Sequence, residues 1–185
     1  TELEKQGKAS DFVMGFEESY GYLAGTHARD KDAVVASMLI CEMAAYYKSQ
    51  GKTLIDVMNG LYDEFGYYCN TVQSYTFEGA AGMEKMAAIM DGLRDNKPSS
   101  FAGYEVTKID DYKTSKSTIV KTGEESEITL PKSNVLAYTL TNGNKVIVRP
   151  SGTEPKIKAY ITAIGQSEEN AKEIAQRLLN DANEL

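Results

Sequence analysis

Apolar residues recur at helical spacing in four stretches of the chain, and capping or glycine signals mark several of their ends. This periodicity predicts helices over residues 33–49, 53–65, 78–94 and 167–179. The second helix begins with a Thr-x-x-Asp pattern at Thr53 that is typical of a capping box. We expect the first helix to pack its apolar side chains on a core and the last one to cover a sheet.

The second half of the chain changes from helical periodicity to alternation of apolar and polar residues. Alternation predicts strands over residues 104–109, 135–141, 145–149 and 156–164. Asn142-Gly143, between the second and third of these runs, is a hairpin signal. The four runs therefore predict an antiparallel sheet, which the last helix would cover on one face.

Three other stretches carry weaker patterns. Residues 12–15 form a short apolar run that ends in glycine, which predicts a buried strand. Residues 67–77 alternate weakly, so that they form either a strand or an extended connection. Residues 113–127 are rich in Thr, Ser, Lys and Glu, and a mobile excursion is expected there.

This order of patterns predicts two domains with a boundary just before the third helix. We expect a partial α/β domain over residues 1–75, followed over residues 76–185 by a small α+β domain whose antiparallel sheet is covered by helices. The predicted fold class is therefore α/β and α+β.

Charge narrows the range of partners. The formal net charge is −7, from 27 acidic residues dispersed among 20 Lys and Arg residues. Dispersed acidity favours solubility and argues against a nucleic-acid or membrane surface. An anionic ligand would therefore need a local basic cluster.

The two cysteines and the start of the chain point to a reduced compartment and to a longer protein. Cys41 lies in an apolar helical pattern and Cys69 lies beside tyrosines, with no CxxC motif, so we expect buried free thiols in a reducing cytoplasm and no structural metal. No apolar run approaches the roughly 18 residues of a membrane-spanning helix. Because the chain starts with Thr1 and lacks an initiator methionine, we expect it to be a piece of something longer.

Residues 149–155, Arg-Pro-Ser-Gly-Thr-Glu-Pro, combine the groups that hold a phosphate. Arg149 offers a planar pair of donors, Ser151 and Thr153 offer hydroxyls, and Gly152 lets backbone N–H groups approach an anion. The two prolines restrict the backbone on either side of the Ser-Gly-Thr centre. The alternative is an ordinary surface turn, which would need only one glycine or proline. The combination favours a preformed phosphate site.

A second candidate follows the first apolar run. Glu17 and Glu18 are adjacent, so in an extended loop they point apart and at most one of them faces a ligand. Together with Ser19 and nearby tyrosines, this loop suits sugar hydroxyls, and the alternative is a solvated acidic turn.

Residues 149–155 resemble the phosphate-binding loop of the α-D-phosphohexomutases, the phosphoglucomutase and phosphomannomutase enzymes. Residues 15–21, Gly-Phe-Glu-Glu-Ser-Tyr-Gly, are similar to the sugar-binding loop of that family, and residues 27–32 to the basic segment that follows it. Two loops in the order found in the family strengthen the resemblance. Tyr20-Gly21 stands where mannose/glucose-type enzymes usually have Gly-His. An aromatic-Gly pair followed by the His-x-Arg-x-Lys-Asp run of residues 27–32 is closer to the phosphoglucomutases, which favours glucose phosphates, whereas Gly21-Tyr22 resembles the related phosphopentomutases.

The resemblance implies roles for individual residues. Glu17 and Ser19 would bind sugar hydroxyls, and Lys31 would reach the substrate near its phosphate. His27 and Arg29 are secondary candidates for substrate binding: a lone histidine is more often structural, and the alternative for the arginine is pairing with Asp30 or Asp32. Arg149, Ser151, Gly152 and Thr153 would bind the phosphate.

The resemblance also implies what lies outside this chain. The family moves a phosphoryl group through a phosphoserine, with Mg²⁺ held by an aspartate-rich loop, and neither motif occurs here. Residues 1–75 would be the C-terminal part of the third, sugar-binding domain, and residues 76–185 the C-terminal phosphate-binding domain. We therefore expect no catalytic residue and no metal in this chain, hexose phosphate as its partner, and no mutase activity without the missing domains. The alternatives are a stand-alone phosphosugar-binding module and a relative of the phosphopentomutases.

Overall fold

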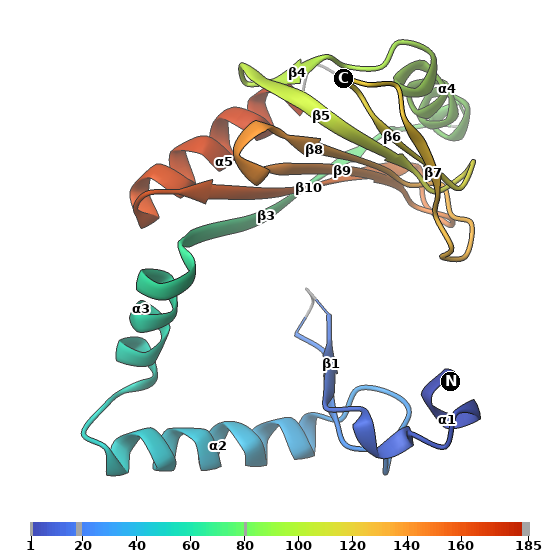
Figure 1. Cartoon of the computed structure of the whole chain (residues 1–185). Coiled ribbons are helices and arrows are strands. Elements are labelled where there is room, and N and C mark those ends of the chain that lie inside the picture. The colour runs from blue at the N-terminus through green and yellow to red at the C-terminus, as the bar shows by residue number, and fades with distance from the viewer. Residues whose placement is uncertain (1, 18–19, 80, 183–185) are drawn as a thin grey trace. The chain divides into compact units, whose positions relative to one another are not determined.

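The computed structural model describes residues 2–17, 20–79 and 81–182, and the chain divides into two units between Leu61 and Tyr62 (Figure 1). The boundary predicted from the sequence lies between residues 75 and 76. The observed division comes earlier because residues 67–76 form a strand that pairs with the sheet of the second unit.

The first unit consists of short segments and two long helices. In chain order they are α1 (Glu2–Lys5), η1 (Ala9–Asp11), β1 (Met14–Phe16), β2 (Tyr22–Ala24), α2 (Ala33–Ser49) and α3 (Leu54–Phe65), the last of which crosses the division. β1 and β2 form an antiparallel hairpin in which Gly15 lies opposite Leu23. The prediction of a buried strand is wrong in its burial, because Val13 is 80% exposed and Met14 52% exposed.

Local capping sets where the two long helices begin. The Asp32 carboxylate accepts hydrogen bonds from the backbone N–H groups of Val34 and Val35 at the start of α2. At the start of α3, the Thr53 N–H donates to Asp56 at 2.8 Å and the Asp56 N–H donates to the Thr53 hydroxyl at 3.1 Å, which is the reciprocal pattern of a capping box. Both predicted helices are confirmed.

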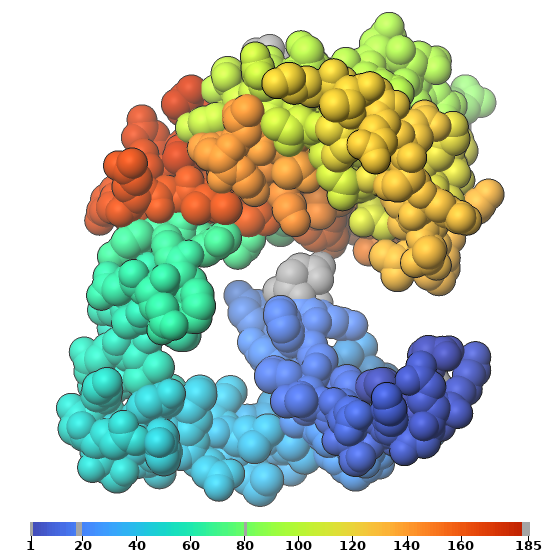
Figure 2. All heavy atoms as spheres, in the orientation of Figure 1, coloured from blue at the N-terminus to red at the C-terminus, as the bar shows by residue number. Residues whose placement is uncertain are grey.

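The packing predicted for the first helix is wrong for the described residues, because no residue of α2 is buried. Its apolar side chains lie on all sides of the helix; Val34 is 80% exposed and Met38 60%. Figure 2 shows the atoms of α2 (light blue) at the surface of the first unit. Cys41 is exposed for the same reason and Cys69 is half-buried, so that the thiols are free but not buried. Within the described residues of the first unit, the sheet consists of β1 and β2 alone and is too small to cover this helix.

The second unit is built on one antiparallel sheet in the order β3-β10-β9-β8-β5-β6-β7, with β4 paired to β5. The elements are β3 (Tyr67–Thr76), α4 (Gly82–Asp95), β4 (Ser100–Phe101), β5 (Tyr104–Asp111), β6 (Lys116–Ile119), β7 (Glu125–Glu127), β8 (Leu136–Leu140), η2 (Thr141–Gly143), β9 (Lys145–Pro150), β10 (Lys156–Gly165) and α5 (Glu168–Ala182). The predicted combination of helices with an antiparallel sheet is confirmed.

The β8–β9 hairpin agrees with its prediction from the sequence, whereas β6 and β7 do not. The predicted hairpin forms between β8 and β9, with Asn142 (φ 64°) and Gly143 (φ 85°) in the left-handed region that such a turn requires. The prediction of a mobile excursion over residues 113–127 is wrong, because this stretch contains β6 and β7, which pair with each other and extend the sheet from β5. Their short polar sequences carry little periodicity, so only the pairing identifies them.

Alternation along β10 separates two faces of the sheet. Ile157, Ala159, Ile161 and Ala163 are buried, and the residues between them are partly exposed. The buried side packs against apolar residues of α4 and α5, among them Met90. The other face carries Lys145 and Arg149 of β9 and Lys158 of β10.

Candidate functional site

The predicted phosphate loop is the connection between β9 and β10. The Ser151 N–H donates to the Lys156 carbonyl at 2.8 Å and so continues the strand ladder into the loop. At the other end, the Pro155 carbonyl accepts a hydrogen bond of 2.8 Å from the Phe77 N–H. The loop is therefore held at both ends by backbone hydrogen bonds of the sheet.

Backbone donors converge at the centre of this loop. The Ser151 hydroxyl accepts from the N–H groups of Thr153 at 3.4 Å and Glu154 at 3.3 Å. Both bonds are long, so an anion with a full charge would compete well for the same donors. No atom lies within 4 Å of the place that a Cβ of Gly152 would occupy, which leaves the loop backbone open to a ligand.

The strand register places two cations side by side at the entrance to the loop. Arg149 on β9 lies directly opposite Lys158 on β10, so both side chains stand on the same face of the sheet. Arg149 is exposed, and among the described residues no salt bridge engages it. Lys156, in contrast, forms an ion pair with Glu154, which lowers the pKa of that carboxyl group.

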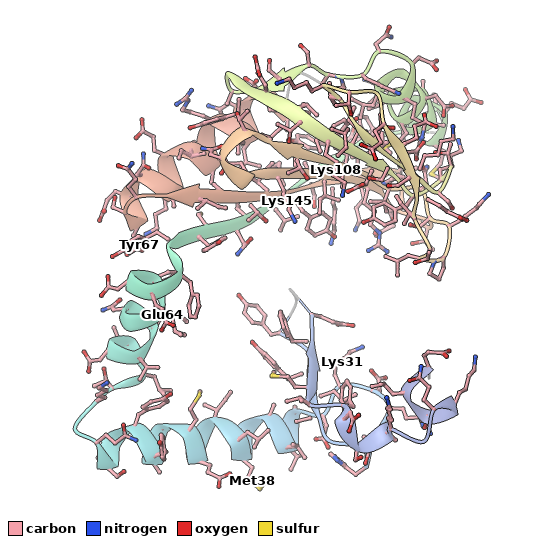
Figure 3. All side chains as sticks on the ribbon, viewed as in Figure 1. Lys31, Met38, Glu64, Tyr67, Lys108 and Lys145 are labelled. Atoms are coloured by element: carbon pink, nitrogen blue, oxygen red, sulfur yellow. The ribbon has the colours of Figure 1, made fainter. Side chains whose placement is uncertain are left out.

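Lys158 is a candidate that the sequence motif alone did not identify. The signal was present in the hairpin: a five-residue connection between two paired strands makes the residues that flank it partners across the ladder. The same face carries Lys145, four residues before Arg149 on β9 (Figure 3). Arg149 and Lys158 form the local basic pair that an anionic ligand requires in an acidic protein, whereas Lys145 lies roughly 13 Å further along the strand, outside the loop.

The predicted sugar loop is the tip of the β1–β2 hairpin. The Glu17 N–H donates to the Gly21 carbonyl at 2.9 Å, which closes the tip. The Lys31 amine lies 3.6 Å from the Glu17 carboxylate and 3.0 Å from that of Asp30. The hydrogen bond and charge of Asp30, and then the charge of Glu17, raise the pKa of the Lys31 amine. The structure therefore brings Glu17 and Lys31 together, and the side chain of Lys31 is half exposed. Figure 3 labels Lys31 beside the β1–β2 hairpin.

The absence of a side chain at Gly21 has a steric reason. A Cβ at Gly21 would come within 2.6 Å of Lys31 Cγ and 3.0 Å of the Glu17 carboxylate. The missing side chain thus lets Lys31 lie across the hairpin tip. Ser19, and Glu18 beside it, lie outside the described residues.

The two secondary candidates have partners within the first unit. His27 Nε2 lies 3.0 Å from the carboxylate of Asp32, the residue that caps α2. Both terminal nitrogens of the Arg29 guanidinium donate to the Glu4 carboxylate, one of them at 3.0 Å. These contacts give His27 and Arg29 structural roles at the helix start and the N-terminal segment.

The described residues offer neither a metal centre nor a membrane span. No group of three or more His, Cys, Asp or Glu side chains is placed to hold a metal ion within residues 2–17, 20–79 and 81–182, so this part of the chain does not fit a resident Mg²⁺ site. In the same ranges, the helices are too short or too polar to cross a bilayer.

Two family models match the chain. The model described as phosphoglucomutase/phosphomannomutase, alpha/beta/alpha domain III, matches residues 2–65, and the model of the C-terminal domain of the same family matches residues 83–180. The two matches lie in the order and on the elements that carry the two candidate loops.

Curated relatives and a solved structure agree with these matches. A phosphoglucomutase of Staphylococcus epidermidis (strain ATCC 12228) is 38% identical over 98% of the chain and 32% of its own length, and one of Staphylococcus aureus (strain COL) is 40% identical over 87% of the chain and 29% of its own length. The open form of pp63/parafusin from Paramecium, a phosphoglucomutase by its title, superposes with a TM-score of 0.62 over 98% of the chain and 31% of its own length at 17% identity, which supports the fold alone. The chain spans about a third of the length of these relatives.

Proposed function

The chain belongs to the phosphoglucomutase/phosphomannomutase family, and from this premise we propose that it is the sugar- and phosphate-recognising part of a phosphohexomutase. The observation that carries the proposal is the pair Arg149 and Lys158 beside the open Ser-Gly-Thr loop. A preformed cluster of donors and cations on an acidic protein suits an anionic ligand better than it suits a turn.

In the proposed complex, the loop between β9 and β10 holds the phosphate group. Arg149 would donate two parallel hydrogen bonds to two phosphate oxygens, and Lys158 would add a second positive charge. The Ser151 and Thr153 hydroxyls and the backbone N–H groups around Gly152 would bind the remaining oxygen atoms. Because β9 and β10 are paired in the middle of the sheet, these donors would need little rearrangement on binding.

The β1–β2 tip would hold the sugar. Glu17 would accept hydrogen bonds from sugar hydroxyls, with Ser19 beside it, and Lys31 would reach toward the phosphate. Lys31 forms ion pairs with Asp30 and Glu17. A sugar phosphate would therefore exchange one of these carboxylate contacts for its own oxygen atoms. His27 and Arg29 remain secondary candidates because Asp32 and Glu4 already engage them.

The reaction would be intramolecular phosphoryl transfer on a hexose phosphate through a phosphoserine outside this chain, in the cytoplasm. Phosphoryl transfer needs in-line positioning of the reacting groups and a metal ion that offsets developing charge. The phosphoserine and the Mg²⁺ would be supplied by other domains, and residues 1–75 and 76–185 would complete the third and fourth domains. Glucose phosphates are the proposed substrates.

The test is the binding of sugar phosphates to the purified chain and turnover by the protein to which it belongs. Glucose 1-phosphate, mannose 1-phosphate and ribose 5-phosphate are titrated calorimetrically, and Glu17→Ala is compared with wild type in turnover. We expect Glu17→Ala to lower turnover while the circular dichroism spectrum stays unchanged. Unchanged kinetics would mean that the hairpin tip is a solvated turn. Binding without turnover in any length of the protein would favour a binding module, and a preference for ribose 5-phosphate would favour a phosphopentomutase relative.

A further inference from the structure

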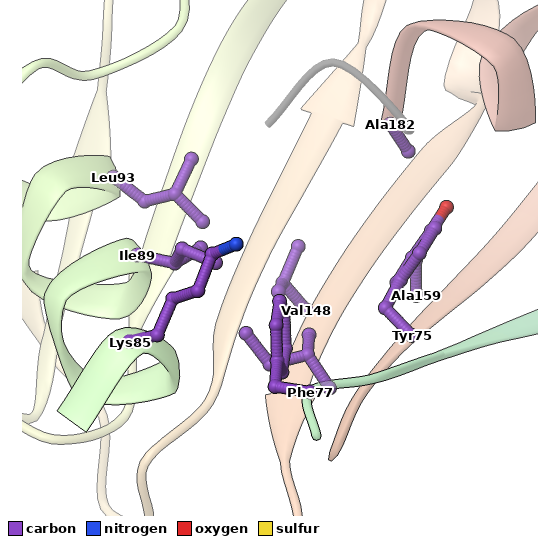
Figure 4. A pocket seen from close by; sticks show the side chains of 9 residues that line it. Tyr75, Phe77, Lys85, Ile89, Leu93, Val148, Ala159 and Ala182 are labelled. Carbon is purple, nitrogen blue, oxygen red and sulfur yellow. The ribbon is translucent and has the colours of Figure 1, made fainter. Parts of the chain in front are cut away.

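A cavity of about 330 Å³ lies on the helix-covered side of the second unit (Figure 4). Its walls come from the end of β3, from α4, from the neighbouring strands β9 and β10, and from Ala182 at the end of α5. Val148 and Ile157, each 3% exposed, contribute apolar surface. A volume of this size is within the range of small-molecule sites.

Two polar side chains, Tyr75 and Lys85, line this apolar space. The Tyr75 hydroxyl is buried and has no hydrogen-bond partner among the described residues. The Lys85 amine stands 5.5 Å from the centre of the Phe77 ring, and among the described residues no salt bridge engages it. A buried hydroxyl without a partner destabilises the protein, and a ligand that accepts its hydrogen bond would recover that loss.

The cavity is separate from the candidate phosphate site. Val148 and Ile157 point to the helix-covered face of the sheet, whereas their neighbours Arg149 and Lys158 belong to the opposite face. Backbone connects the two sites, because Phe77, which lines the cavity, donates its N–H to Pro155 of the phosphate loop.

We propose that this cavity binds a small carboxylate whose flat or extended apolar body carries a hydroxyl or carbonyl group at its far end. The carboxylate would pair with Lys85, the body would lie against Val148, Ile157 and Ile89, and the far group would accept the hydrogen bond of Tyr75. In Figure 4 the Lys85 amine and the Tyr75 hydroxyl stand on opposite sides of Val148, which suits a ligand with a polar group at each end. Burial raises the pKa of the Tyr75 hydroxyl, so that it stays protonated and able to donate.

Three related compounds test each part of the site on the 185-residue chain: 6-hydroxy-2-naphthoate, 2-naphthoate without the hydroxyl, and 2-naphthol without the carboxylate. Binding is followed by NMR of labelled methyl groups. We expect saturable shifts at Ile89, Val148 and Ile157 and none at the exposed methyl groups of Val34 and Ile40 in the first unit.

Variants identify the two polar contacts. Lys85→Glu should weaken binding of both naphthoates by about tenfold and leave 2-naphthol unchanged. Tyr75→Phe should weaken 6-hydroxy-2-naphthoate and leave 2-naphthoate unchanged. Lys172→Glu, at an exposed lysine on α5, is the matched control for charge and should change none of them.

The proposal fails if the shifts do not saturate, if they occur at the first-unit methyl groups instead, or if Lys85→Glu and Lys172→Glu have equal effects. Lys85 is exposed, so its replacement should keep the fold, and the amide spectrum checks this. Because inorganic phosphate can be titrated separately, loss of the phosphate site and loss of this cavity site are distinguishable.

Discussion

Arg149 is the residue on which the phosphate proposal depends most. Removing a pair of charge-assisted hydrogen bonds costs roughly 1.5–3 kcal/mol, so Arg149→Ala should weaken glucose 1-phosphate binding by about one to two orders of magnitude. Arg149→Lys should recover little, because an amine cannot reproduce the planar pair of donors. The melting temperature should barely change, since the side chain is exposed. Calorimetric titration beside a melting curve measures both quantities.

The control for that experiment is Lys145→Ala, which removes a positive charge from the same strand outside the loop. If Arg149→Ala and Lys145→Ala weaken binding equally, the effect is general electrostatics. If neither does, the connection between β9 and β10 is a turn. A large fall in melting temperature for Arg149→Ala would assign it a structural ion pair instead.

Tyr138 provides a residue-scale test of the core. Its side chain is 1% exposed, and burial raises its pKa from 10.0 to about 12. The folded state therefore holds the phenol proton more tightly than the unfolded state. The stability that results is fully present below pH 10 and is lost at roughly 1 kcal/mol per pH unit between about pH 10 and 12.

Tyr138→Phe should flatten this alkaline loss, as measured by urea denaturation at pH 8 and pH 11. At pH 8 the variant should be as stable as wild type or slightly more stable, because the Tyr138 hydroxyl has no hydrogen-bond partner among the described residues. Tyr68→Phe, on the edge strand at a position 44% exposed, is the control and should follow wild type. If the free energy of unfolding fell equally between pH 8 and pH 11 in all three proteins, Tyr138 would not be the source of the alkaline loss.

At the scale of elements, the start of α4 packs closely against the loop between β9 and β10. A Cβ at Gly82 would lie 2.5 Å from the Phe77 carbonyl oxygen and 2.9 Å from Pro155 Cβ. The carbonyl oxygen cannot move aside without breaking strand geometry, because the N–H of the same residue bonds Pro155. This contact couples the helix to the loop.

Gly82→Ala should therefore destabilise the second unit by about 1–3 kcal/mol and weaken phosphate binding, although alanine favours helix. Gly92→Ala in the same helix meets nothing within 4 Å and should stabilise by about 0.5–1 kcal/mol. Urea denaturation and phosphate titration of both variants check these signs. If both substitutions raised the free energy of unfolding, helix propensity would outweigh the close packing of α4 at Gly82.

At the scale of the whole molecule, the two units differ in how completely they bury their apolar residues. The second unit has a continuous core between its sheet and its helices, whereas α2 carries exposed apolar side chains around its whole circumference. A helix that is apolar on all sides is normally buried. This contrast supports the proposal that the first unit is completed by other parts of a mutase.

The purified 185-residue chain should consequently show no conversion of glucose 1-phosphate at any Mg²⁺ concentration. The reason is that the proposed nucleophile and metal ligands lie outside it. A coupled assay for glucose 6-phosphate measures this, with chain from a host strain that lacks its own mutase. Conversion above that background would show that the chain carries a complete site and would overturn the proposed division of roles.

The sequence alone determined what depends on neighbours along the chain. Capping at Asp32 and Thr53, periodicity within each helix, and the turn at Asn142-Gly143 act over a few residues, so the helices and the central hairpin were predicted correctly. The chemistry of residues 149–155 was readable for the same reason. The membership of these residues in a site remains a prediction.

Only the tertiary structure decided what depends on residues distant in the chain. The pairing of β3 with β10 joins segments about 90 residues apart and moves the division of the chain. The contact of Arg29 with Glu4, the burial of Tyr138 and the exposure of α2 likewise follow from which surfaces meet. Periodicity reports that a side chain is apolar or charged, but its partner is chosen by packing between elements, which local sequence does not encode.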